Sequence, residues 1–454
     1  MRFTVGNTER LFSAFSSRPQ DAIGFRHDVQ NHLDATLPPA VGGRNAARTP
    51  KRVVLAVNGL WEFASLPTHR PLRLEMFSHF LLLVDLIGEL TNLGLQCDFL
   101  DFRHPGRSAA FFSPPAVVRI LPLSTRSIRH EVENKYREAF AMLLPAHACP
   151  RIAIIEPEHA EQPIEELTAL ARAELMDSPH GPADIVVVCG GILSPYFLEH
   201  ALGGVPARAF LYCYSMCNTT LRPAVYEAAL SPAPQRTSIP GLIVRKRPGI
   251  DTIRAAGLVP RSGDSPPLAR VANDQPYAVI AIGIAVGGLI DEHYVDLLAR
   301  VRRRLGSLSL CVVGTPGLLR PDLAERLSAA NVHVDEVGMT TSIAMTLATL
   351  KGRAVVACNP RGTGNGGSLA QVVLAGFPVL IWSANDAEHL LTSDVLIESE
   401  AELEDRLVLY MTNPQMRATA LTEAMLQLRA RVEESRRELR SLVAGPLATP
   451  QATL

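Results

Sequence analysis

The sequence has no excess of charge of either sign, little charge overall, and none of the compositional bias of a disordered chain. It carries 44 Lys+Arg against 45 Asp+Glu, and the formal net charge of −1 excludes a generally basic protein that binds nucleic acid by neutralising its phosphates. Charged residues make up 20% of the chain and apolar residues 47%, which excludes disorder as the main state. At ~100–200 residues per domain, 454 residues predict two or three domains with large cores.

Signals for export and for membrane insertion are also lacking. The N-terminal residues, MRFTVGNTERLFSAF, have no continuous apolar stretch typical of a signal peptide. The apolar stretch 277–290 has only 14 residues, whereas a bilayer span needs ~20. The seven cysteines are an odd number, and several lie within apolar runs, which favours buried thiols in a reducing compartment over a disulfide framework. We therefore expect a cytoplasmic protein with no membrane span.

Continuous apolar runs that alternate with helical segments predict parallel sheets covered on both faces. Such runs lie at 52–59, 95–102, 151–157, 184–191 and 207–215, and again at 277–284, 308–314, 332–338, 353–360 and 377–382. The fold expected is therefore α/β, with two Rossmann-like domains and a cleft between the carboxyl ends of their sheets. The expected divisions are an N-terminal extension (1–50), a first domain (51–230), a Pro-rich linker (231–275), a second domain (276–413) and a C-terminal helix with its tail (414–454).

The segment with the strongest functional signal is 359–382, which reads NPRGTGNGGSLAQVVLAGFPVLIW. It predicts a strand exit, a glycine-rich turn, a helix and a further strand. The glycines allow the backbone to approach a ligand closely, and Ser368 with the free N–H groups of the helix start favours an anion in the loop. The segment is neither a P-loop nor a GxGxxG dinucleotide fingerprint, and a flexible loop without a ligand is the alternative.

This segment resembles the C-terminal domain of GT-B glycosyltransferases, and most of all glycosyltransferase family 41. That family contains O-GlcNAc transferase and the bacterial cytoplasmic adhesin N-glucosyltransferases. The resemblance is carried by Asn359-Pro360, Gly364-Asn365 and Gly376-Phe377-Pro378. It also implies that the long final helix packs back on the first domain. It implies that the loop binds the diphosphate of a UDP-sugar, with donor-side residues Asn359, Arg361, Gly364, Asn365, Gly366, Gly367, Ser368 and Asp386.

Two of these assignments have alternatives. Asp386, after the next strand, would hold the ribose, or it is a solvated loop carboxylate. The basic residue that contacts the diphosphate in the family is matched by Arg361 or by Arg320, and an ordinary surface arginine is the alternative for each.

The segment 211–227 resembles a second part of the family, in the N-terminal domain, where the bacterial enzymes have Gly-His-Pro-Ala-Thr-Thr. Thr219 and Thr220 match this pattern, but Met216 stands where the histidine would be. The resemblance therefore implies that these three residues line the acceptor side. The departure at Met216 leaves open whether the chain transfers a sugar.

Candidate catalytic residues lie in loops that follow predicted strands. Glu62 and His69 follow the first strand, at the sheet edge where ligands bind, and either could act as a general base toward the acceptor. His389, just past Asp386, could transfer a proton near neutral pH or be a surface histidine.

These observations predict a bacterial, metal-independent GT-B glycosyltransferase that moves a sugar from a UDP-sugar to a protein or peptide acceptor. The protein acceptor is implied by the resemblance alone. No Asp-x-Asp occurs, so we expect no metal and no cofactor, the leaving diphosphate being stabilised by a helix dipole and side-chain donors. No nucleic-acid partner is expected, and an oligomer is possible. The alternatives are a non-catalytic nucleotide-sugar-binding partner subunit, a natural-product glycosyltransferase or a sugar-nucleotide epimerase.

Overall fold

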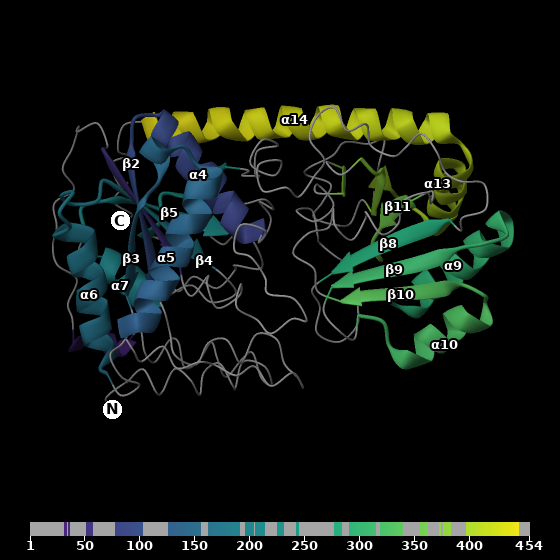
Figure 1. The fold of residues 1–454 in the computed structure, drawn as a ribbon, viewed down its shortest axis with the longest axis horizontal. Coiled ribbons are helices and arrows are strands. Elements are labelled where there is room, and N and C mark those ends of the chain that lie inside the picture. Colours follow the sequence, from purple (N-terminus) through teal and green to yellow (C-terminus); the bar gives the residue numbers. More distant parts are fainter. Residues whose placement is uncertain are drawn as a thin grey trace, which may run out of the picture. The chain divides into compact units, whose positions relative to one another are not determined.

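The chain divides into two compact units, Met1–Lys246 with Ser435–Leu454, and Arg247–Glu434 (Figure 1). The computed structural model describes residues 31–33, 35–36, 51–57, 78–102, 126–155, 162–190, 196–203, 205–213, 225–230, 242–244, 277–283, 290–314, 318–338, 355–361, 372–373, 376–382 and 396–444. Each unit contains its own parallel sheet, which confirms the prediction of two Rossmann-like domains.

The sheet of the first unit has seven strands in the order β3-β2-β1-β4-β5-β6-β7, and all paired strands are parallel. The strands are β1 (Arg52–Val57), β2 (Gln96–Phe102), β3 (Arg151–Ile155), β4 (Ile185–Gly190), β5 (Arg208–Cys213), β6 (Ala228–Leu230) and β7 (Leu242–Val244). Every residue of β1 is buried, as expected for a central strand covered on both faces.

Helices cover both faces of this sheet. One hydrophobic core contains residues of α4 (Ser78–Asn92) and α5 (Arg126–Leu143), and the other contains residues of α6 (Ile164–Met176) and α7 (Tyr196–Leu202). Alternate residues of β1 contribute to the two cores, Val53 to the first and Val54 to the second. The sheet is therefore doubly wound.

The sheet of the second unit has six parallel strands in the order β10-β9-β8-β11-β12-β13. They are β8 (Ala278–Gly283), β9 (Ser309–Gly314), β10 (His333–Gly338), β11 (Val355–Cys358), β12 (Val379–Trp382) and β13 (Leu396–Ile397). Residues of this sheet form one described core with residues of three helices, α9 (Glu292–Leu305), α10 (Pro321–Ala329) and α13 (Glu400–Thr412).

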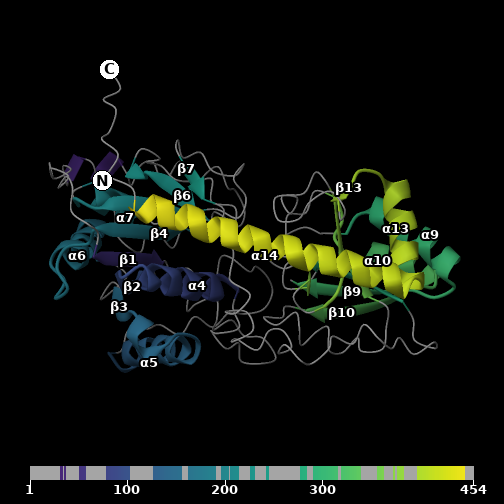
Figure 2. The ribbon, with the colours of Figure 1, turned by 90° about the horizontal axis from the view of Figure 1, so that it is seen from above.

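The final helix, α14 (Pro414–Ala444), contributes residues to one core in each unit. Near its start Ala420 packs in the core of the second unit, whereas Leu439 and Val443 pack in the first. Arg436 Nε donates to Glu89 Oε1 of α4 at 3.0 Å, so the last turns of α14 are fixed against α4 (Figure 2). This packing on the first unit agrees with the expectation from the sequence.

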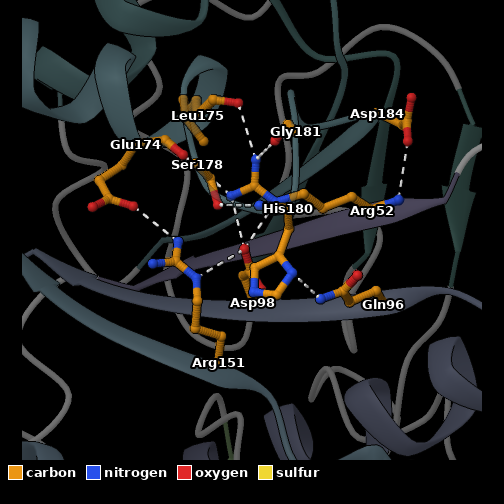
Figure 3. Close-up of polar contacts among 10 residues, drawn as sticks. All are labelled: Arg52, Gln96, Asp98, Arg151, Glu174, Leu175, Ser178, His180, Gly181 and Asp184. Atoms are coloured by element: carbon orange, nitrogen blue, oxygen red, sulfur yellow. Dashed lines mark hydrogen bonds and ion pairs between the residues drawn. The ribbon is translucent and has the colours of Figure 1, made fainter.

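The strand starts of the first sheet are held by a buried ionic network (Figure 3). Arg52 and Asp98 are 2% and 0% exposed, and Arg52 Nε donates to Asp98 Oδ2 at 2.8 Å. Arg52 also donates to the carbonyls of Glu174, Leu175 and Gly181, which caps the end of α6. Arg151 bonds the same Asp98 oxygen at 3.3 Å. The network fastens β1, β2, β3 and α6 at the amino edge of the sheet.

Several short elements have no counterpart in the sequence prediction. β7 lies inside the stretch expected to be a linker, and β6 and β13 have only three and two residues. Strands this short show no period of apolar residues. Most of the helix predicted within 359–382 lies outside the described residues. Among the described helices, none is long and apolar enough to span a bilayer.

We predict that Arg52→Met lowers the free energy of unfolding by about 3–5 kcal/mol, because the Asp98 carboxylate stays buried after losing its main partner. The control is Lys135→Met, which breaks an exposed pair with Glu138 at 3.1 Å and should cost less than about 1 kcal/mol. Urea unfolding followed by circular dichroism measures both. Equal losses for the two variants would contradict this role of the network.

Candidate functional site

The candidate site lies where the second sheet changes the direction of its strand order. From β8, the strands β9 and β10 follow on one side, and β11, β12 and β13 follow on the other. In open α/β sheets ligands bind beyond the carboxyl ends of the strands at such a switch point. Here it lies just past Gly283 and Cys358, the last residues of β8 and β11. The segment that begins at Asn359 therefore leaves the sheet at the switch point.

Asn359 replaces a missing piece of the strand ladder. The pairing of β11 with β8 ends at Ala357 and Ile280. Asn359 is 2% exposed, its Oδ1 accepts from the N–H of Ile282 at 2.8 Å, and its Nδ2 donates to the carbonyl of Ile282 at 2.8 Å. Since buried backbone groups need partners, this side-chain amide takes the place of a peptide unit. The two hydrogen bonds join the ends of β8 and β11, and we call this pair of bonds the Asn359 clamp.

A second contact fixes the end of β11 to helix α9. The buried hydroxyl of Tyr294 donates to the carbonyl of Cys358, and burial raises the pKa of Tyr294 well above its usual range, so it remains a donor. Tyr294 N–H in turn donates to Asp291 Oδ1 at 2.8 Å, which caps α9. Burial likewise raises the pKa of the Cys358 thiol far above its usual range, so this thiol is an inert core group.

Arg361 presents a positive charge at this exit. Its guanidinium carbon lies 5.6 Å from the ring centroid of Trp382, within the range of a cation–π contact. Arg361 is exposed, and no carboxylate pairs with it among the residues that the structure describes. The other candidate, Arg320, instead donates to both oxygens of Asp322, at 3.1 and 2.8 Å. Among the described residues, only Arg320 of the two arginines is paired with a carboxylate.

The structure describes two of the predicted site residues, Asn359 and Arg361, and places both at the switch point. The remaining ones lie outside the described residues, and their roles stay predictions: Glu62, His69, Met216, Thr219, Thr220, Gly364, Asn365, Gly366, Gly367, Ser368, Asp386 and His389.

The strands that precede two of these segments in the sequence are described. β1 ends at Val57, just before the segment with Glu62 and His69, and β5 ends at Cys213, just before Met216. Both strands end at the carboxyl edge of the first sheet, which is the edge at which such folds bind ligands.

Two residues of the site are missed by sequence reasoning, Tyr294 and Trp382. Each is an aromatic residue within a predicted helix or strand, where packing in the core is the ordinary interpretation. The one signal for Trp382 is its place as the last residue of the predicted strand 377–382. The contact of Tyr294 with Cys358 joins residues 64 positions apart, which no local pattern reveals.

The described residues contain no group of three or more His, Cys, Asp or Glu side chains that could hold a metal ion. Because the loop residues of the site lie outside that part of the chain, the expectation of a metal-free site stays a prediction.

In sequence, no family model and no curated protein matches this chain. In structure, it is similar to the Anabaena protein HepE in complex with UDP and glucose, with a TM-score of 0.53 and 13% identity over 87% of this chain and 99% of that one. A mutant O-GlcNAc transferase of Thermobaculum terrenum is similar with a TM-score of 0.54 and 13% identity, over 96% of this chain and 76% of that one. A glycosyltransferase of Rickettsia africae is similar with a TM-score of 0.53 and 9% identity, over 87% of this chain and 98% of that one. The chain therefore has the GT-B fold, as predicted.

We predict that Asn359→Asp destabilises the second unit by about 3 kcal/mol, because a carboxylate oxygen then faces the carbonyl of Ile282 in place of a donor. The loss should shrink on acidification, since a protonated carboxyl can donate again. Asn413→Asp makes the same chemical change at a helix start, where Asn413 Oδ1 accepts from Met416 N–H at 3.1 Å and Asp serves equally well. Thermal unfolding at pH 7 compares the two variants, and equal stability would contradict the clamp.

Proposed function

We propose that this chain is a metal-independent glycosyltransferase similar to family 41, which binds a UDP-sugar at the switch point of the second sheet and transfers the sugar to a protein or peptide. The observation that carries the proposal is the exposed Arg361, which has no carboxylate partner among the described residues and lies beside the Asn359 clamp, on a GT-B fold. The similarity to a structure solved with UDP and glucose and to an O-GlcNAc transferase supports it.

The donor site would bind the diphosphate through two kinds of group. The planar guanidinium of Arg361 matches the geometry of phosphate oxygens and stays charged at every physiological pH. The helix start predicted at Gly367-Ser368 would add free N–H groups and the positive end of its dipole. As the bond between the anomeric carbon and the diphosphate breaks, charge develops on the leaving oxygen. These donors would stabilise that charge most in the transition state.

The acceptor side would supply the nucleophile and take up its proton. An acceptor amide or hydroxyl attacks the anomeric carbon, UDP leaves, and the acceptor proton passes to a base. Glu62 and His69, on the segment after β1, are the proposed bases, with His389 as a further candidate on the donor side. Met216, Thr219 and Thr220 are proposed to line the acceptor side.

Met216 also favours a second candidate function. By the resemblance of segment 211–227, it stands at the position where the bacterial family 41 enzymes have a histidine. The chain could therefore bind a nucleotide sugar without transferring it, as a partner subunit of another protein. Release of UDP from UDP-glucose or UDP-N-acetylglucosamine in the presence of acceptor peptides separates the two functions. Turnover supports the transferase, and tight binding without any turnover supports the partner subunit.

We predict that UDP raises the unfolding temperature of the chain, and that ADP and NAD raise it much less. A UDP concentration ~100-fold above its Kd should stabilise the chain by about 2.7 kcal/mol. EDTA should leave this stabilisation unchanged, because no metal is proposed at the site. Differential scanning fluorimetry measures the shifts. Equal protection by ADP, or loss of the UDP shift with EDTA, would count against the proposed site.

We predict that Arg361→Met raises the Kd for UDP by about 10- to 100-fold, the loss expected for one hydrogen-bonding contact to a charged group. Arg320→Met is the matched control, because its charge is already taken up by Asp322. Calorimetric titration of UDP into both variants gives the two constants. An unchanged Kd for the Arg361 variant would remove Arg361 from the site.

A further inference from the structure

The register of the second sheet brings Trp382 level with the chain that leaves β11. β11 and β12 pair at Ala357 with Val379 and at Cys358 with Leu380. Two residues further along, Pro360 is level with Trp382, so that Arg361 follows directly beside the indole. On its other side, Trp382 pairs with Ile397 of β13. The ring therefore stands on a backbone that is held at the carboxyl edge of the sheet.

The indole is a rigid platform. Trp382 is 4% exposed and belongs to the core of the second unit, together with Leu380 and Tyr410. Arg361, by contrast, is exposed, and its guanidinium lies over the ring at 5.6 Å. A cation–π contact acts through the charge of the guanidinium and takes up none of its N–H donors in a hydrogen bond. A fixed ring can thus orient Arg361 without using its hydrogen-bonding capacity.

A second arginine in cation–π contact with a ring, Arg208, shows what is particular to the pair of Arg361 and Trp382. Arg208 lies 5.2 Å from the ring centroid of Phe210 in the first unit, but its Nε donates to Glu227 at 2.8 Å and its Nη1 to the carbonyl of Val443. That guanidinium is neutralised by its neighbours and joins strands to α14. The guanidinium of Arg361 has no described carboxylate beside it and lies at the switch point.

We propose that Trp382 is a positioning residue that holds the guanidinium of Arg361 toward the diphosphate of the donor. The inference rests on the proposed function, because it assumes that Arg361 contacts that diphosphate. If Trp382 has this role, an aromatic ring at position 382 increases the affinity for the donor, and it does so only by orienting Arg361.

The chemistry of the indole makes a conservative variant informative. Trp382 Nε1 is buried and has no hydrogen-bond partner among the described residues. Trp382→Phe therefore removes no hydrogen bond and keeps an aromatic face. Trp382→Leu removes that face and keeps an apolar side chain.

The test is a double-mutant cycle in which UDP is titrated calorimetrically into the full chain. We expect Trp382→Leu to raise the Kd by about three- to tenfold, in line with a cation–π contact, and Trp382→Phe to stay within about twofold of the unaltered chain. In the Arg361→Met background, Trp382→Leu should cause no further loss, because the residue through which it acts is gone.

The other outcomes overturn the inference in distinguishable ways. Equal losses from Trp382→Leu with and without Arg361 would mean that the ring only supports the core, and the inference alone would fail. A loss for Trp382→Phe as large as that for Trp382→Leu would also overturn it, because the aromatic face would not be the determinant. If the unaltered chain does not bind UDP, the proposed function fails and takes the inference with it. Circular dichroism confirms folding, and Trp382→Met, which likewise lacks an aromatic face, replaces the Leu variant in the cycle should that variant unfold.

Discussion

Strands buried on both faces must satisfy their backbone polar groups inside the sheet, and in the second unit this requirement is hardest to meet where β11 leaves β8. The backbone pairing of the two strands ends there at Ala357 and Ile280, and the N–H and carbonyl of Ile282, two residues further on, still need partners. Asn359 supplies both with one side-chain amide. The direction in which the next residues leave the sheet, and with it the position of Arg361, follows from that substitution of side chain for backbone.

Charge compensation separates the arginines that hold the structure together from the one assigned to a ligand. Arg52 is buried against Asp98 and three carbonyls at the amino edge of the first sheet, and Arg208 is neutralised by Glu227. Removing either partner of such a buried pair leaves an isolated charge, which is why these residues stabilise the fold only as pairs. Arg361 is exposed, makes a cation–π contact with Trp382 and has no described counter-ion. A bound diphosphate would be its counter-ion.

The sequence predicts the long strands of both sheets well, because strands such as β4 and β8 are continuous apolar runs bounded by glycine or polar residues. It does not predict β6, β7 or β13, whose pairing depends on neighbours that are already in place. It predicts a donor site after the Asn-Pro strand exit, which stays a prediction, and it does not reveal the clamp, because Asn359 and Ile282 are 77 positions apart. Whether Asn359 also contacts the donor, as the resemblance implies, stays a prediction.

A crystal structure of the chain grown with UDP tests most directly whether the switch point of the second sheet binds the donor diphosphate. We expect the diphosphate beyond the carboxyl ends of β8 and β11, with a phosphate oxygen at about 2.7–3.2 Å from the guanidinium of Arg361 and the Asn359 clamp intact. UDP bound away from this edge, or an Arg361 that points away from the phosphates, would contradict the assignment.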